Sequence, residues 1–132
     1  MNAALLRSFL HHLDPDERVT ILRSSQDPSL HEYLAFSGNA GTCNMDPDDQ
    51  IFVQIDDLGG ATKAVWLEEL AHARQFMIYG SIEASADWSE RCKWEIEVHE
   101  CLLNNAKRLK LTPQEISDCK RQLDFYKGVQ HG

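Results

Sequence analysis

Residues 65–78 read Val-Trp-Leu-Glu-Glu-Leu-Ala-His-Ala-Arg-Gln-Phe-Met-Ile, a segment of helical periodicity that is apolar nearly all the way round. A helix of this kind is usually central and buried. It nevertheless carries two adjacent carboxylates, Glu68 and Glu69, and a histidine, His72. Buried charges destabilise a fold unless they are paired, protonated or bound to a metal. The segment therefore indicates both a core helix and a polar site on it.

The spacing of these polar residues places several of them along one line of the helix. At about 100° per residue, Glu68, His72, Gln75 and Tyr79 form a single stripe, and Glu69 lies beside it. Glu68 and His72 are four residues apart, so both side chains are able to reach one ion.

Local signals on both sides set the bounds of this helix. Thr62 is a capping residue and Gly80 a stop signal, which predicts a helix over residues 63–79. The residues before it, 51–55, are β-branched and apolar, and they predict the one convincing strand, which Gly59 and Gly60 terminate. A turn over 46–49 and a loop over 37–41 precede the strand.

A second long helix is predicted from about Ser85 to Leu109. Its apolar face comprises Trp94, Val98, Cys101, Leu102 and Leu109. By helical periodicity, Glu95 lies about 50° from the centre of that face and Glu97 about 110°. Glu95 is therefore predicted to point inward, with His99 supporting it from one turn further on. A last helix starts at the capping box Thr112–Glu115 and is expected to end before Gly128.

The N-terminal third is predicted to be helical. A short helix covers residues 2–13, and Asp14-Pro15 restarts a second one whose apolar side is Val19, Ile21 and Leu22. Asp27-Pro28 starts a third, with Leu30, Tyr33 and Leu34 facing inward. We expect Trp66, Trp88 and Trp94 in the core, and His11, His12 and His31 on solvated faces.

Together these elements predict a mainly helical α+β fold in one domain over residues 1–132. The N-terminal helices occupy residues 1–37, and the core unit occupies 41–127.

The net charge of −8 disfavours binding to a phosphate backbone and suits a basic protein partner. No stretch approaches the ~20 apolar residues of a membrane span. The four cysteines have irregular spacing, which predicts reduced thiols in a soluble cytoplasmic protein.

The segment Leu67–Gln75 resembles the active helix of zincin-type metallopeptidases, including compact ones found as bacterial effector or toxin modules. Their pattern is H-E-x-x-H, in which the histidines bind zinc and the glutamate activates water. The resemblance covers residues 41–127 and implies that His72 is a zinc ligand and Glu69 the general base. It places Glu68 where the first histidine stands. The gluzincin pattern implies a third ligand about twenty residues on, from Glu95 or Glu97.

Replacing that histidine by Glu68 changes the chemistry of the site. Two carboxylates and one histidine give an ion more ligand charge, which weakens it as a Lewis acid. They also shift preference from zinc towards manganese or iron. This favours a degenerate zincin-like protein that binds a protein partner, with or without a metal. The alternatives are an active metal-dependent peptidase with Glu69 as base, and an all-helical domain in which Glu68 and His72 form a structural polar cluster.

Overall fold

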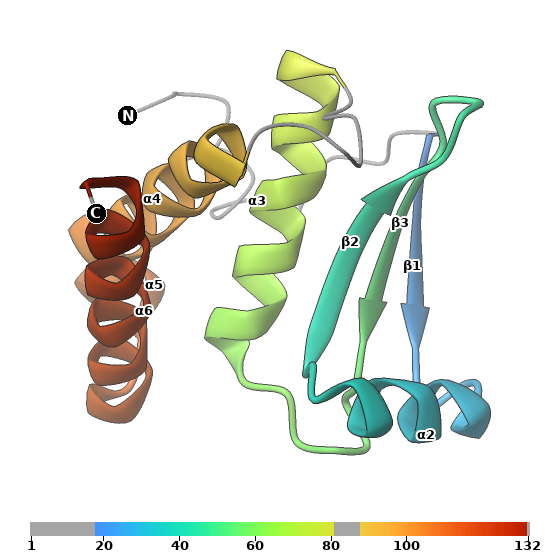
Figure 1. Cartoon of the computed structure of the whole chain (residues 1–132). Helices are drawn as coiled ribbons and strands as arrows, with labels where there is room; N and C mark the ends of the chain where they lie inside the picture. Colours follow the sequence, from blue (N-terminus) through green and yellow to red (C-terminus); the bar gives the residue numbers. More distant parts are fainter. Residues whose placement is uncertain (1–17, 81–87, 132) are drawn as a thin grey trace.

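The computed structural model describes residues 18–80 and 88–131 and has a small sheet followed by helices (Figure 1). It confirms a mainly helical α+β fold. The elements, in chain order, are β1 (Val19–Arg23), α2 (Pro28–Ser37), β2 (Gly41–Met45), β3 (Ile51–Ile55), α3 (Lys63–Tyr79), α4 (Trp88–Asn104), α5 (Ala106–Leu109) and α6 (Pro113–His131). The strand order is β1-β3-β2; β1 is parallel and β2 antiparallel to the central strand.

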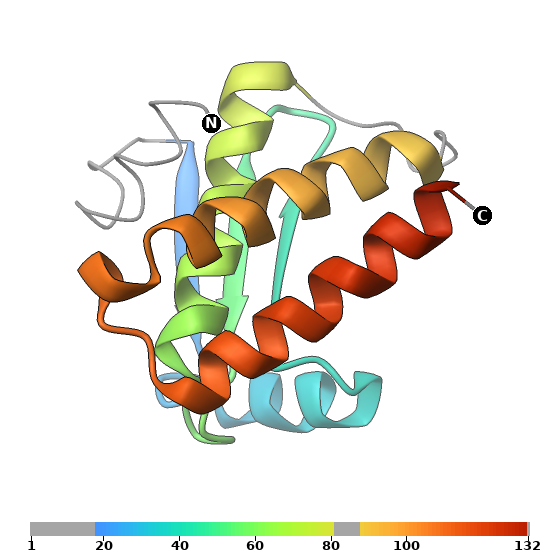
Figure 2. The same cartoon turned by 90° about the vertical axis from the view of Figure 1, so that its left-hand side faces the viewer.

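Helix α3 lies between two layers. One of its sides packs on the sheet, and α4 and α6 cross its other side (Figures 1 and 2). Ala73 joins the core of the sheet, whereas Leu67 and Ala71 join a second core with residues of α4 and α6. Burial on both sides explains why this helix is apolar nearly all round.

The ends of α3 lie where the local signals predict them. The Thr62 hydroxyl accepts a hydrogen bond from the backbone N–H of Val65 at 3.3 Å. At the other end, Gly80 has a φ of +80° and its N–H bonds to the carbonyl of Phe76. Positive φ is costly for residues with a Cβ, so glycine is suited to this stop.

The predicted second helix is wrong where it covers Val19, Ile21 and Leu22, because these residues form strand β1. Val19 pairs with Ile51 and Ile21 with Val53 in the parallel ladder. The β-branched residues suit a strand, and pairing with β3 outweighs the upstream helix-start signal. Residues 1–17, with the predicted helix over 2–13, His11 and His12, lie outside the described residues.

A further strand was not predicted. Residues 41–45 form β2, which joins β3 through the predicted turn over 46–49, where Asp49 has a φ of +62°. The sequence Gly41–Met45 has few apolar residues and is only partly buried, and it forms a strand at the edge of the sheet by pairing with β3.

Helix α2 begins at its predicted cap. Asp27 accepts from the N–H of Ser29, and Leu30 and Leu34 are buried. Tyr33 was predicted to face inward, but it is 60% exposed, because its helical position is at the edge of the face that Leu30 and Leu34 bury and not at its centre. Trp88, expected in the core, is likewise 55% exposed at the first residue of α4.

The two C-terminal helices differ from prediction at their ends. The helix predicted to reach Leu109 stops at Asn104, because the Asn105 side chain donates to the carbonyl of Cys101 and a separate turn, α5, follows. Its predicted apolar face is buried. Helix α6 continues past Gly128 to His131, so that glycine does not end it.

The capping box of α6 forms as predicted and also reaches another helix. Thr112 accepts from the N–H of Glu115, whose carboxylate accepts from the N–H of Thr112 at 3.0 Å. The same carboxylate accepts from the N–H of Ala64 at 2.7 Å. Glu115 therefore caps α6 and α3 together.

All four cysteines are free thiols. Of the helices in the described ranges, none combines the length and apolar composition that crossing a membrane requires.

Candidate metal centre

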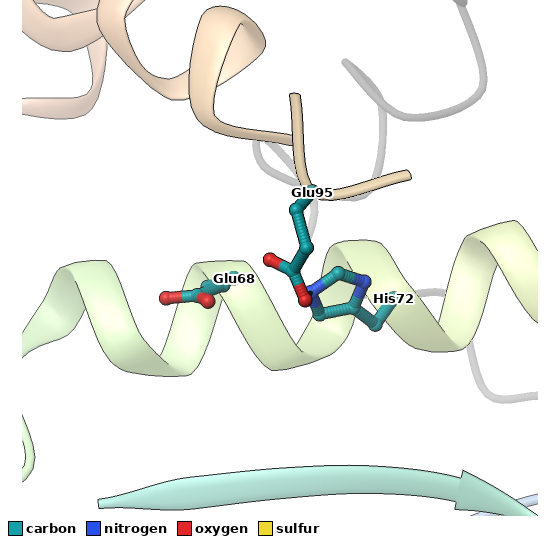
Figure 3. A group of neighbouring side chains, drawn as sticks. All are labelled: Glu68, His72 and Glu95. Carbon is teal, nitrogen blue, oxygen red and sulfur yellow. Dashed lines mark ion pairs between the residues drawn. The ribbon is translucent and has the colours of Figure 1, made fainter. Parts of the chain in front are cut away.

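Three side chains from two helices converge beside α3. Glu68 and His72 lie one turn apart on α3, and Glu95 reaches towards them from α4 (Figure 3). One ligand atom from each lies within 4.8 Å of the other two. Their side chains are 20%, 12% and 19% exposed, so the group is mostly buried but still open to solvent. These are the three residues that the sequence predicts as metal ligands.

Helical geometry explains this convergence. Residues at i and i+4 of one helix lie on the same face, which brings Glu68 and His72 together. Helix α4 packs on that face, and its residue Glu95 lies at the edge of its own apolar side. The predicted inward direction of Glu95 is therefore what places it opposite His72.

The His72–Glu95 pair is the closest contact in the group. His72 Nε2 lies 3.2 Å from Glu95 Oε1. Burial favours the neutral form of both side chains. For His72 the hydrogen bond to Glu95 and the nearby carboxylates outweigh burial, and for Glu95 the hydrogen bond and the charge of His72 do so. The pKa of His72 rises to about 10, and that of Glu95 falls below its usual range. Without an ion, the proton on Nε2 therefore takes the position of a cation between the two residues.

Burial has the opposite effect on the two carboxyls of α3. It raises the pKa of Glu68, against the attraction of His99 and His72. It raises the pKa of Glu69 to about 8, an increase that His72 opposes and that the carboxylates of Glu68 and Glu95 reinforce. Both shifts are the response expected of carboxyls gathered in a poorly hydrated site, and the shift of Glu69 is large enough to leave it mostly protonated at neutral pH.

Glu69, the predicted general base, lies on the sheet side of α3. It is only 8% exposed. A Cβ added to Gly41 of β2 would lie 2.9 Å from Glu69 Cγ, so the carboxyl stem passes over a strand position that has room only for glycine. It nevertheless adjoins the three-residue group, because it directly follows Glu68 and lies three residues before His72 on the same helix.

His99 lies under the group, as predicted for a supporting residue. It is 1% exposed, and its Nδ1 donates to the backbone carbonyl of Glu95 at 2.7 Å. Its ring nitrogens also lie 3.7 Å from Glu68 Oε1 and from Glu95 Oε2. The ring therefore holds the α4 backbone at Glu95 and faces both carboxylates.

The alternative third ligand, Glu97, has other partners. Its carboxylate accepts hydrogen bonds from Gln75 at 3.0 Å and from the Tyr79 hydroxyl at 2.9 Å. Among the described residues, the group of ligand atoms contains Glu95 and not Glu97. Gln75 was placed on the correct stripe by its spacing from His72, but its contact with that histidine was not predicted.

A second polar cluster lies at the end of the sheet and was also missed. His31 Nδ1 lies 2.8 Å from Asp56 Oδ1, to which the hydroxyl of Ser24 also donates at 2.8 Å. His31 was expected on a solvated face; it remains 41% exposed but is tied to a buried carboxylate. The cluster joins α2 to the ends of β1 and β3, which is a structural role.

Comparison with models of protein families, with curated proteins and with solved structures found no match. What the structure supports is a small α+β domain with a three-stranded mixed sheet and a candidate Glu-His-Glu metal-binding group.

Proposed function

We propose that Glu68, His72 and Glu95 bind a divalent metal ion, and that the protein is a zincin-like, metal-dependent hydrolase of peptide bonds. The observation that carries the metal site is the convergence of one ligand atom from each of these three side chains in a mostly buried group. Within the described part of the chain, Glu95 Oε2 is buried and has no hydrogen-bond partner. An unpaired buried carboxylate oxygen is costly, and an ion between the three side chains would satisfy it.

The donor set fits such an ion. One imidazole and two carboxylates suit first-row divalent metals, and the oxygen-rich balance favours manganese or iron more than the usual zinc set does. Two ligand carboxylates would neutralise the two charges of the ion. A bound ion supplies Lewis-acid polarisation of a carbonyl and makes a coordinated water more acidic.

The remaining residues of this chain have roles that follow from their positions. Glu69 matches the glutamate of H-E-x-x-H and would take a proton from the attacking water. In the absence of an ion, the pKa of Glu69 is about 8. A nearby dication favours the ionised carboxylate, so the same residue would become a base when the metal is present. The contacts that hold His72 and Glu95 in place support an active centre rather than the degenerate, partner-binding protein that the sequence favours.

The test separates metal binding from hydrolysis. Untagged protein, prepared without added metal, is titrated with Mn²⁺, Fe²⁺ and Zn²⁺ by calorimetry and then assayed on a fluorogenic peptide library. We expect His72→Ala and Glu95→Gln to abolish tight binding. His31→Ala, a histidine in another carboxylate pair, is the matched control and should bind normally. Glu69→Gln should bind metal but lose hydrolysis. Hydrolysis that survives Glu69→Gln would contradict the proposed base.

A second function, binding of a basic protein partner, is supported by charge and by exposed aromatic residues. The net charge is −8, and α2 presents Phe36 at 94% exposure and Tyr33 at 60%, three residues apart on one side. Phe36→Ser should then abolish partner capture, whereas Phe125→Ser, an exposed phenylalanine of α6, should not. If the two substitutions had equal effects on partner capture, α2 would be excluded as the contact surface.

A further inference from the structure

The orientation of the Gln75 side chain is determined by its partners on α4. Gln75 is fully buried. Its Nε2 donates to the backbone carbonyl of Trp94 at 3.0 Å and to Glu97 Oε1 at 3.0 Å. A carbonyl and a carboxylate oxygen accept hydrogen bonds only, so the amide group must turn its NH₂ towards α4. Its oxygen then faces back along α3.

That oxygen faces His72. Gln75 Oε1 lies 2.8 Å from His72 Nδ1. Because an amide oxygen cannot donate, Nδ1 must carry the hydrogen. The other ring nitrogen, Nε2, is the one 3.2 Å from Glu95 Oε1. When His72 is neutral, its lone pair is therefore on the nitrogen that faces the candidate ligands.

The chain of contacts extends beyond Gln75. The Tyr79 hydroxyl donates to both oxygens of Glu97, at 3.1 and 2.9 Å. His72, Gln75 and Tyr79 lie along one stripe of α3, and Glu97 lies opposite them on α4. Glu97 is thus held as an acceptor between Tyr79 and Gln75, which keeps the amide from turning over.

We propose that Gln75 is a positioning residue that fixes the Nδ1–H tautomer of His72, so that an ion in the Glu68–His72–Glu95 group is bound through His72 Nε2. This inference rests on the proposed metal site and adds how its single imidazole is aligned. Partners of this kind orient ligating histidines, and their loss typically weakens metal binding 10–100-fold. Glu97 and Tyr79 act on the histidine only through Gln75.

Two variants test the role. Gln75→Met keeps the length of the side chain but removes the acceptor for Nδ1–H, so we expect zinc affinity to fall about 10–100-fold. The double variant Gln75→Glu/Glu97→Gln provides an acceptor for Nδ1–H at residue 75 and a donor to it at residue 97, at unchanged net charge. A carboxylate oxygen of residue 75 then meets the carbonyl of Trp94, to which the amide donated. We therefore expect only part of the lost affinity to return, giving a value between those of Gln75→Met and the wild type.

The coordinating nitrogen is identified by NMR. With ¹¹³Cd²⁺ as the probe and ¹⁵N-labelled histidine, the wild type should show cadmium coupling to Nε2 of His72. Coupling to Nδ1, or unchanged affinity and coupling in Gln75→Met, would overturn the inference while leaving the metal site intact. If the wild type bound no ion, the proposed function would fail. In that case the contact between His72 Nδ1–H and Gln75 is tested in the ion-free protein, where it should give a protected Nδ1–H resonance. Absence of that resonance would also overturn the inference.

Discussion

His72 on α3 and Glu95 on α4 form an ion pair, with Nε2 of the histidine 3.2 Å from Oε1 of the glutamate. The contact joins two helices that cover the same core, and it uses the atoms that a metal ion would use. In the proposed metal site, a proton and a metal ion would therefore compete for one position. This competition makes several properties of the protein measurable through pH and through single substitutions.

Metal affinity should rise with pH. The pKa of His72 is raised to about 10, so at neutral pH its ring holds a proton that an ion must displace, and the raised pKa of Glu68 acts in the same direction. Affinity for Mn²⁺ or Zn²⁺ should increase by up to about tenfold per pH unit for each proton released. Calorimetry in buffers of different ionisation enthalpy gives the number of protons. His31→Ala should release as many as the wild type, and a pH-independent affinity would contradict the competition.

Replacing Glu68 by histidine should strengthen zinc binding. The substitution removes one ligand charge and supplies a second imidazole, a donor that zinc prefers to a carboxylate oxygen. We expect Glu68→His to bind Zn²⁺ at least about tenfold more tightly and to lose preference for Mn²⁺. Glu90→His, which introduces a histidine at an exposed position of α4, is the control and should change nothing. Competition with a chromophoric chelator measures both affinities.

The part of this structure that sequence predicts well depends on local signals. Thr62 and Gly80 delimit α3 by capping contacts within a few residues, and helical periodicity alone turns Glu95 inward. Strand β1 could not be predicted in this way, since Val19 pairs with Ile51, far along the chain. Contacts of that range have no signature in a short window of sequence.

The candidate site likewise has a part that local sequence predicts and a part that it does not. The i, i+4 pair of Glu68 and His72 is visible in the sequence, and Glu95 follows from the face of one helix. The role of Gln75 could not be predicted, because it depends on the backbone carbonyl of Trp94 in another helix. The position of Glu69 depends on Gly41, in a strand that its own sequence does not predict.

The shared cap at Glu115 should contribute more to stability than an ordinary helix cap. Thr112→Ala removes one hydrogen bond at the start of α6 and should cost about 1 kcal/mol. Glu115→Ala removes the acceptor for the N–H groups of Thr112 and Ala64, and should cost about 2 kcal/mol or more. Gln114→Ala, on the exposed side of the same turn, should be close to neutral. Urea unfolding measures all three, and equal effects of the two capping substitutions would refute the link to α3.

The stability of the ion-free protein should fall with rising pH because of Glu69, and Glu69→Gln should remove that loss. The carboxyl has a pKa of about 8 in the folded protein and an ordinary value of 4.5 when exposed. The folded state therefore holds a proton that the unfolded state releases between these pH values, so the free energy of unfolding decreases there as pH rises. The slope is at most about 1.4 kcal/mol per pH unit. Glutamine resembles the protonated form, and the variant should gain stability relative to the wild type from pH 5 to pH 8.

Glu100→Gln, at a half-exposed carboxylate paired with Lys127, is the control for Glu69→Gln and should follow the wild type. Urea titrations in the presence of a chelator supply the comparison. Parallel curves for Glu69→Gln and the wild type would show that this carboxyl is already ionised at neutral pH.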